Sequence, residues 1–226
     1  MNCLHQMKLP GGWLALSFAA LLAAGCATPG TVSNPARPGD GLRAYQRLVL
    51  DLRKDATLTR KAVEALGAAT QQNSGTTYAR FAVSLQRLEV ISIKARARVE
   101  AMEKRGEAYF EEWTEEISGT AGEEARRAAK ERFAELHRHF EAILNDTAQV
   151  RQKFRPYLER LRELRTKLGP KPMFAAIESG KPDYAQFASA GRQAEESMSQ
   201  LLKTLKAAEA AVMAGPTPLP KPGGKL

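Results

Sequence analysis

The feature that most constrains the fold is a sustained alternation of three- and four-residue steps between apolar or small positions. Such a period brings one residue of every turn to the same side of a helix and is typical of coiled-coil packing. Four runs follow it, at about 42–66, 81–113, 133–168 and 184–212. Alanine, glutamate, leucine, lysine and arginine recur throughout, which favours long helices. The pattern predicts an all-α chain with four long coiled-coil-like helices.

Turn-forming residues separate the runs. Gly169-Pro170 is expected to end the third helix, and residues 172–179 are expected to add one or two helical turns. Pro156 lies inside the third run, where its missing N–H predicts a kink or a break. The residues expected to cap helix N-termini are Asp40, Thr77, Thr120 and Asp183.

The lengths of the runs predict an elongated antiparallel bundle. Short connections make consecutive helices antiparallel, and the second and third helices are longer than the first and fourth. Four helices can therefore overlap over only part of the bundle. The hairpin between the second and third helices, about Glu107–Glu135, is expected to project beyond the four-helix body.

The N-terminus resembles a bacterial lipoprotein signal. An apolar core of about a dozen residues ends in Ala23-Ala24-Gly25-Cys26 and is too short for a membrane-spanning helix. We expect a signal peptide over 1–25, with Met7 as an alternative start, and a lipid-modified Cys26. Ala27, and not aspartate, follows the cysteine. By analogy with enterobacterial lipoprotein sorting, this favours the periplasmic face of the outer membrane over the inner membrane.

The expected domain organisation follows from these ends. The lipidated cysteine and a flexible linker occupy 26–40, a helical bundle 41–213, and a Pro/Gly-rich tail 214–226. Cys3 and Cys26 are the only cysteines, so the mature bundle has no disulfide to form.

The stretch GEAYFEEWTEEISG, residues 106–119, combines three aromatic residues with five glutamates. Tyr109, Phe110 and Trp113 share one helical stripe, opposite bulk offered by Phe133 and Phe140. We expect these rings to hold the hairpin together, with Gly106 making room. Because two helices cannot bury a full stripe, part of the aromatic surface should stay open to a partner or to a second copy.

The glutamates of this stretch repel one another at four-residue spacing. A turn at 119–122 predicts compensation by ion pairs of Glu115 with Arg126 or Arg127 and of Glu111 with Lys130. A calcium site is the weaker alternative, since no loop with spaced oxygen ligands accompanies them. The candidate partner contact comprises Tyr109, Phe110, Trp113, Glu111, Glu112, Glu115 and Glu116.

The chain has a formal net charge of +9, and many of its basic residues lie near the end of the third helix. The candidate basic patch comprises Arg151, Lys153, Arg155, Arg160, Arg162, Arg165 and Lys167. A solvated face partly paired by Glu159 and Glu163 is the simplest interpretation. Export makes nucleic acid improbable, so a partner would be an anionic polymer such as peptidoglycan or an acidic protein.

Motifs for catalysis or cofactor binding are missing from the sequence. His137 and His139 point to different faces of a helix, and neither has the glutamate three residues earlier that a di-iron bundle uses. There is no zinc ligand set, phosphate-binding loop or nucleophile elbow. We therefore expect a non-enzymatic protein with no cofactor.

Two segments carry a family resemblance. RGEAYFEEWTEEI at 105–117 and FRPYLERLRELRTKLG at 154–169 resemble the domain of unknown function 2959 family, and the likeness extends over about Tyr45–Val212. The resemblance implies a helical proteobacterial lipoprotein and supplies no catalytic residue.

These observations together predict a lipid-anchored structural or interaction protein, a scaffold or adaptor, of the bacterial cell envelope. Its expected partners are the membrane, through the lipid, and an envelope protein or anionic polymer; a homo-oligomer stays open. The alternatives are a periplasmic ligand- or metal-binding bundle and, third, an envelope hydrolase.

Overall fold

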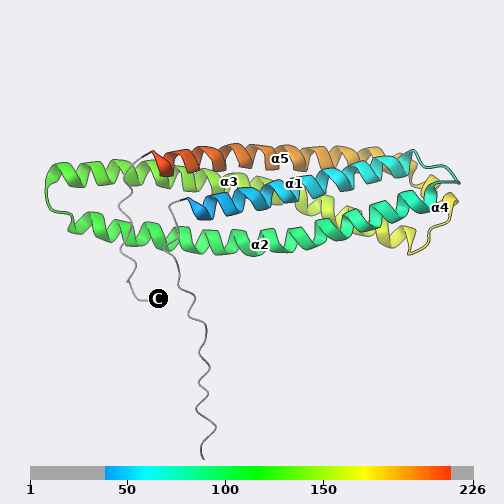
Figure 1. The fold of residues 1–226 in the computed structure, drawn as a ribbon, viewed down its shortest axis with the longest axis horizontal. Coiled ribbons are helices and arrows are strands. Elements are labelled where there is room, and N and C mark those ends of the chain that lie inside the picture. The colour runs from blue at the N-terminus through cyan, green and yellow to red at the C-terminus, as the bar shows by residue number, and fades with distance from the viewer. Residues whose placement is uncertain (1–38, 215–226) are drawn as a thin grey trace, which may run out of the picture. The chain divides into compact units, whose positions relative to one another are not determined.

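The computed structural model describes residues 39–214, and all regular structure in that range is helical (Figure 1). The long helices are α1 (Asp40–Gly67), α2 (Ser74–Gly119), α3 (Glu123–Leu168) and α5 (Lys181–Met213). The short helix α4 (Phe174–Ser179) lies in the last connection, where one or two turns are predicted. The all-α bundle of four long helices is confirmed. The predicted signal peptide, Cys26, the predicted linker up to residue 38 and the predicted tail from residue 215 lie outside the described residues.

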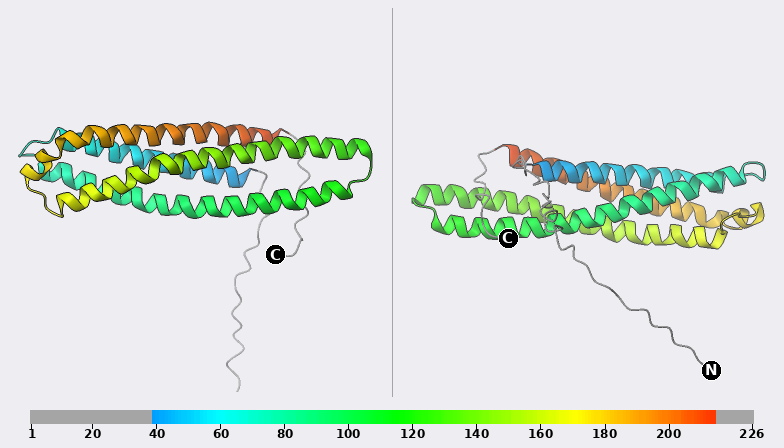
Figure 2. Two further views of the ribbon diagram at one scale, coloured as in Figure 1. Left: turned by 180° about the vertical axis from the view of Figure 1, so that it is seen from behind. Right: turned by 60° about the horizontal axis from the view of Figure 1, so that its bottom comes forward.

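Neighbouring long helices run antiparallel, as predicted. Arg43 near the start of α1 pairs with Glu209 near the end of α5, whereas Arg60 pairs with Glu195, earlier in α5. The ion pairs between α2 and α3 follow the same reversed order. The views in Figure 2 show the four helices side by side.

The buried positions follow the three- and four-residue steps of the sequence. In α1 the pattern is unbroken, since every predicted position from Tyr45 to Leu66 is buried. The same steps in α3 bury Leu136, Ile143 and Phe154. Each large apolar side chain buried in this way contributes about 1.5–3 kcal/mol, so this shared core is the main source of stability.

The four predicted N-caps are wrong. The residues that precede the helices are Gly39, Asn73, Gly122 and Gly180. Thr77 lies inside α2 and donates its hydroxyl to the Asn73 carbonyl, and Thr120 donates to the Glu116 carbonyl at the end of α2. Such bonds to the carbonyl four residues earlier compete with capping for the same side chain.

Pro156 does not break its helix, because α3 continues from Glu123 to Leu168. The end of α3 is confirmed at Gly169, whose φ of 73° favours glycine. Its carbonyl accepts a hydrogen bond from the Tyr78 hydroxyl, which ties this end of α3 to the start of α2.

The hairpin of α2 and α3 extends beyond α1 and α5, as Figure 1 shows. The predicted extent, Glu107–Glu135, is too long. Helix α5 reaches Arg132, whose Nη2 donates to the Ala211 carbonyl at 2.6 Å. That carbonyl belongs to the last turn of α5 and also accepts a hydrogen bond from the Ala214 N–H at 3.3 Å. Arg132 therefore adds a second hydrogen bond there and ties the end of α5 to the hairpin.

Two buried tyrosines give a matched prediction. The Tyr45 hydroxyl lies 3.1 Å from the Thr147 hydroxyl, whereas the Tyr157 hydroxyl has no hydrogen-bond partner among the described residues. An unsatisfied buried polar group costs about 1–3 kcal/mol, and a satisfied hydrogen bond contributes about 1 kcal/mol. Tyr157→Phe should therefore raise the free energy of unfolding at pH 7 and Tyr45→Phe should lower it, each by about 1 kcal/mol. Urea denaturation of both variants beside the wild type measures the two signs; equal losses would contradict this account.

The pH dependence offers a second measurement of the same pair. Burial raises the pKa of both phenols, so the folded state holds these protons more tightly than the unfolded state does. Their contribution to stability is complete below the ordinary tyrosine pKa of about 10 and is lost as the pH rises above it. Either phenylalanine variant should therefore lose less stability than the wild type between pH 9 and 11.

Candidate functional site

The hairpin has an aromatic core of its own, built where the sequence predicts it. Trp113 is 1 % exposed, stacks on Phe110 at 6.3 Å and meets Phe133 edge-on at 5.6 Å between ring centroids. Phe110 also contacts Phe140 at 5.4 Å. Aromatic pairs in such geometries add about 0.5–1.5 kcal/mol beyond their area burial.

The expectation that this aromatic surface stays open to a partner is wrong for two rings. Trp113 and Phe110 are buried in a cluster that α2 and α3 form and that Ala211 and Val212, at the end of α5, complete. Only Tyr109 of the three candidate aromatic residues remains half-buried. A partner of this hairpin must therefore recognise its polar side chains.

The predicted ion pairs across the turn do not form. Arg126 binds Glu123 of its own helix and donates to the Thr120 carbonyl, so it does not reach Glu115. Five exposed glutamates of α2 make no ion pair within residues 39–214: Glu107, Glu111, Glu112, Glu115 and Glu116. We call these five residues the acidic face. It presents uncompensated negative charge on a rigid, projecting hairpin.

A cavity of about 350 Å³ lies beside the acidic face, where α1 begins. Its walls come from all four long helices and are mostly apolar, with Tyr109 and Phe110 from the same stretch of α2. The lining residues are Gly39, Gly41, Leu42, Arg98, Ala101, Met102, Arg105, Gly106, Tyr109, Phe110, Leu136, His139, Phe140, Ile143, Ala208 and Val212. This cavity was not predicted from the sequence. The small residues at positions 101, 106 and 208, which line it, are the sequence feature that could have indicated it.

The candidate basic patch is largely paired. Arg162 and Arg165 both bind Glu89 of α2, at 2.8 and 3.2 Å. Arg151 binds Glu103, and Arg155 binds Glu159. The predicted partner Glu159 is thus present, whereas the described residues give Glu163 no ion pair. Lys153, Arg160 and Lys167 are the members without an ion pair in that range, so less charge is available here than the sequence suggests.

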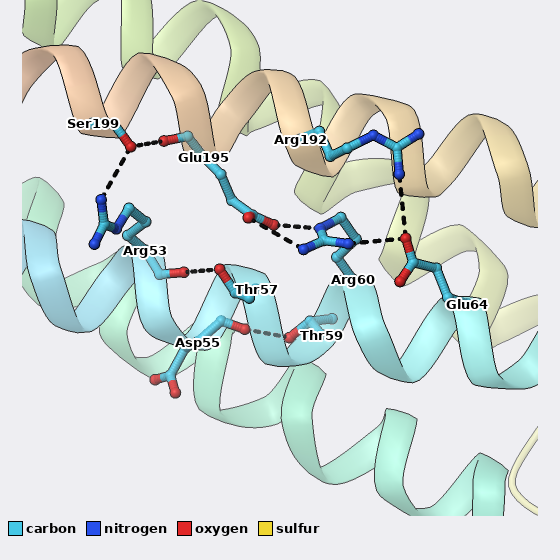
Figure 3. A network of polar contacts seen from close by, with 9 residues as sticks. All are labelled: Arg53, Asp55, Thr57, Thr59, Arg60, Glu64, Arg192, Glu195 and Ser199. Atoms are coloured by element: carbon cyan, nitrogen blue, oxygen red, sulfur yellow. Dashed lines mark hydrogen bonds and ion pairs between the residues drawn. The ribbon is translucent and has the colours of Figure 1, made fainter.

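A charged network between α1 and α5 also has its groups satisfied (Figure 3). Arg60 binds Glu195 through Nε at 2.6 Å and Glu64 through Nη1 at 2.9 Å, and Arg192 reaches Glu64 at 3.2 Å. Arg53 donates to the Ser199 hydroxyl on the same side. Because these donors bind side chains of the neighbouring helix, the network fastens α1 to α5.

Metal chemistry finds no support in the part of the chain that the structure describes. No group of three or more His, Cys, Asp or Glu side chains is placed to hold an ion there. His137 contacts Phe110 and Phe133 and lies 3.7 Å from Glu141, whereas His139 lines the cavity. Within residues 39–214, no helix has the length and apolar character required to cross a membrane.

These features define an all-α bundle with an acidic hairpin and an apolar cavity. The family model for "Protein of unknown function (DUF2959)" matches residues 52–168, which include all of α2 and α3. The chain belongs to this family. No curated protein and no solved structure matches it.

Proposed function

We propose that this chain is a non-enzymatic, lipid-anchored protein of the bacterial cell envelope that acts as a scaffold through its projecting hairpin. The acidic face is the observation that carries the proposal. Like charges at four-residue spacing cost helix stability. The glutamates of the acidic face repel one another and have no ion pair within residues 39–214 that would offset the repulsion. This arrangement is consistent with a partner that supplies the positive charge.

The packing of the hairpin is suited to presenting the acidic face to a partner. The aromatic core of the hairpin packs α2 against α3, and the contact of Arg132 with Ala211 ties α3 to the end of α5, so the carboxylates are presented on a packed element. Binding to a preorganised surface loses less conformational entropy than binding to a mobile loop. We propose that the partner is an envelope protein with a basic surface. Acylated Cys26 would anchor the chain to the periplasmic face of the outer membrane, from which the hairpin contacts this partner.

A ligand-binding bundle is the second candidate function, and the cavity favours it. A volume of about 350 Å³ lies within the range of small-molecule sites. The lining includes no carboxylate, serine or cysteine, so it offers the third alternative, a hydrolase, none of these nucleophiles.

The scaffold proposal predicts a charge-specific loss of partner binding. Glu111→Gln/Glu112→Gln/Glu115→Gln removes three charges of the acidic face, and we expect co-purification of envelope proteins with the acylated chain to fall about tenfold. The matched control is Glu100→Gln/Glu163→Gln/Glu196→Gln, which changes three exposed glutamates elsewhere that make no ion pair within residues 39–214. Quantitative mass spectrometry of crosslinked complexes gives the readout. An equal loss in both triple variants, or no loss in either, rules out the acidic face as the contact surface.

A further inference from the structure

The cavity arises from how the bundle is built. Arg98 of α2 donates to the Gly41 carbonyl at 3.5 Å, so α1 starts beside Arg98 while α2 continues to Gly119. Past this point none of the described helices continues the line of α1. Two positions of the cavity lining carry small residues, Ala101 and Ala208, which do not fill the space.

The interior of the cavity is apolar and its edge is cationic. Leu136, Ile143 and Ala208 are buried in its wall and offer no hydrogen-bonding side chain. Arg98 is half-buried and Arg105 is exposed, so both guanidinium groups lie at the solvent edge. A ligand that fills this space needs a body without polar groups and one charged end.

The two arginines are positioned to act together. They are seven residues apart on α2, which places them on one face of the helix about 10 Å apart along its axis. Arg98 makes the hydrogen bond to Gly41 described above, and Arg105 makes no ion pair within residues 39–214. Most of their N–H donors are therefore open to an anion, and a planar guanidinium matches carboxylate and phosphate oxygens in geometry. His139 at the same cavity adds a third nitrogen-bearing side chain.

We propose that the cavity binds a single acyl chain whose anionic end is held by Arg98 and Arg105. The hydrocarbon fills the space among Met102, Phe140 and Ile143, and the carboxylate or phosphate lies at the arginines. A neutral hydrocarbon would leave the guanidinium groups unused, and a ligand with several polar groups would bury them without partners. The inference goes beyond the scaffold function, because it uses none of the acidic face and stands whether or not that face binds a protein.

Photolabelling of the full chain in its own envelope membranes tests the inference. One probe is a diazirine fatty acid, a second is a diazirine lysophospholipid, and a third is a diazirine alkane of equal length without a head group. We expect peptides spanning residues 101–113 and 136–143 to carry the label from an anionic probe, at least about tenfold above the alkane. The stronger of the two anionic probes distinguishes a carboxylate from a phosphate end.

Variants separate the cavity from general membrane exposure. Ala208→Phe and, independently, the milder Ala101→Leu fill the space, and both should reduce labelling about tenfold. Arg98→Gln/Arg105→Gln should reduce labelling by the anionic probes to the level of the alkane. The control Arg80→Gln/Arg96→Gln removes two exposed α2 charges away from the cavity and should leave labelling unchanged.

Three results would overturn the inference. Equal labelling by the alkane would remove the role of the arginines. Unchanged labelling in both cavity-filling variants would place the probe elsewhere. Labelling that appears only after Cys26→Ser would show that the chain's own acyl group occupies the cavity, and not a separate lipid. Circular dichroism and limited proteolysis of each variant confirm that it is folded when it is labelled.

Discussion

Replacing Trp113 with alanine is expected to lower the free energy of unfolding by about 3–5 kcal/mol. Trp113 is 1 % exposed and is among the largest fully buried side chains in the described part of the chain. Its removal opens a cavity between α2 and α3. Phe110 and Phe133 can close this cavity only by giving up their present edge-to-face contact with each other. Urea denaturation followed by helical circular dichroism measures the loss.

The control for this prediction is Ile93→Ala. Ile93 lies on the same helix but is 66 % exposed, so its truncation should change stability by no more than about 0.5 kcal/mol. If Trp113→Ala costs no more than Ile93→Ala, the hairpin does not have the aromatic core described above. The candidate site would then lose its rigid support.

Gly106→Ala should destabilise the protein by up to about 2 kcal/mol, although alanine is the better helix former. A Cβ at this position would lie 2.2 Å from Cε2 of Phe140, far inside van der Waals contact. Overpacking of this kind costs about 1–3 kcal/mol, against a gain in helix propensity of about 1 kcal/mol. Phe140 borders the cavity, so a shift of its ring into that space keeps the net cost moderate.

The sign of this effect should reverse when Phe140 is removed. In a Phe140→Ala background the steric conflict is absent, and Gly106→Ala should stabilise the protein by about 1 kcal/mol. Gly75→Ala is the reference for an unobstructed position in the same helix, because no atom lies within 4 Å of its added Cβ. Stabilisation by Gly106→Ala in both backgrounds would contradict the close packing of Gly106 on Phe140.

The helices and their core could be predicted because burial repeats with the period of the α-helix. The steps from Tyr45 to Leu66 and from Leu136 to Leu168 carry enough apolar surface to set which face is inside. Helix starts were harder, because Thr77 and Thr120 can either cap or bond within a helix. For Thr120 the choice goes with the positive φ of Gly122, which precedes α3 in its place and which no side-chain pattern records.

The candidate site was predicted in position and only partly in character. The sequence places aromatic and acidic residues on the hairpin, yet it does not show that α5 reaches Arg132 and covers Trp113. It also favours ion pairs of Arg126 with the glutamates of α2, whereas Arg126 is used by the turn and by its own helix. The cavity depends on where α1 starts relative to Gly106 of α2. This position is set by the tertiary packing of the helices and cannot be read from the pattern of either helix alone.

Site-specific photocrosslinking tests the scaffold proposal most directly. A benzoylphenylalanine at Glu112, on the acidic face, is compared with one at Glu163, an exposed glutamate of α3, in the full chain produced in its native cells. The proposal predicts a discrete protein adduct at residue 112 that is lost with Glu111→Gln/Glu115→Gln and is absent at residue 163. The same adducts at both positions, or none at residue 112, would contradict it.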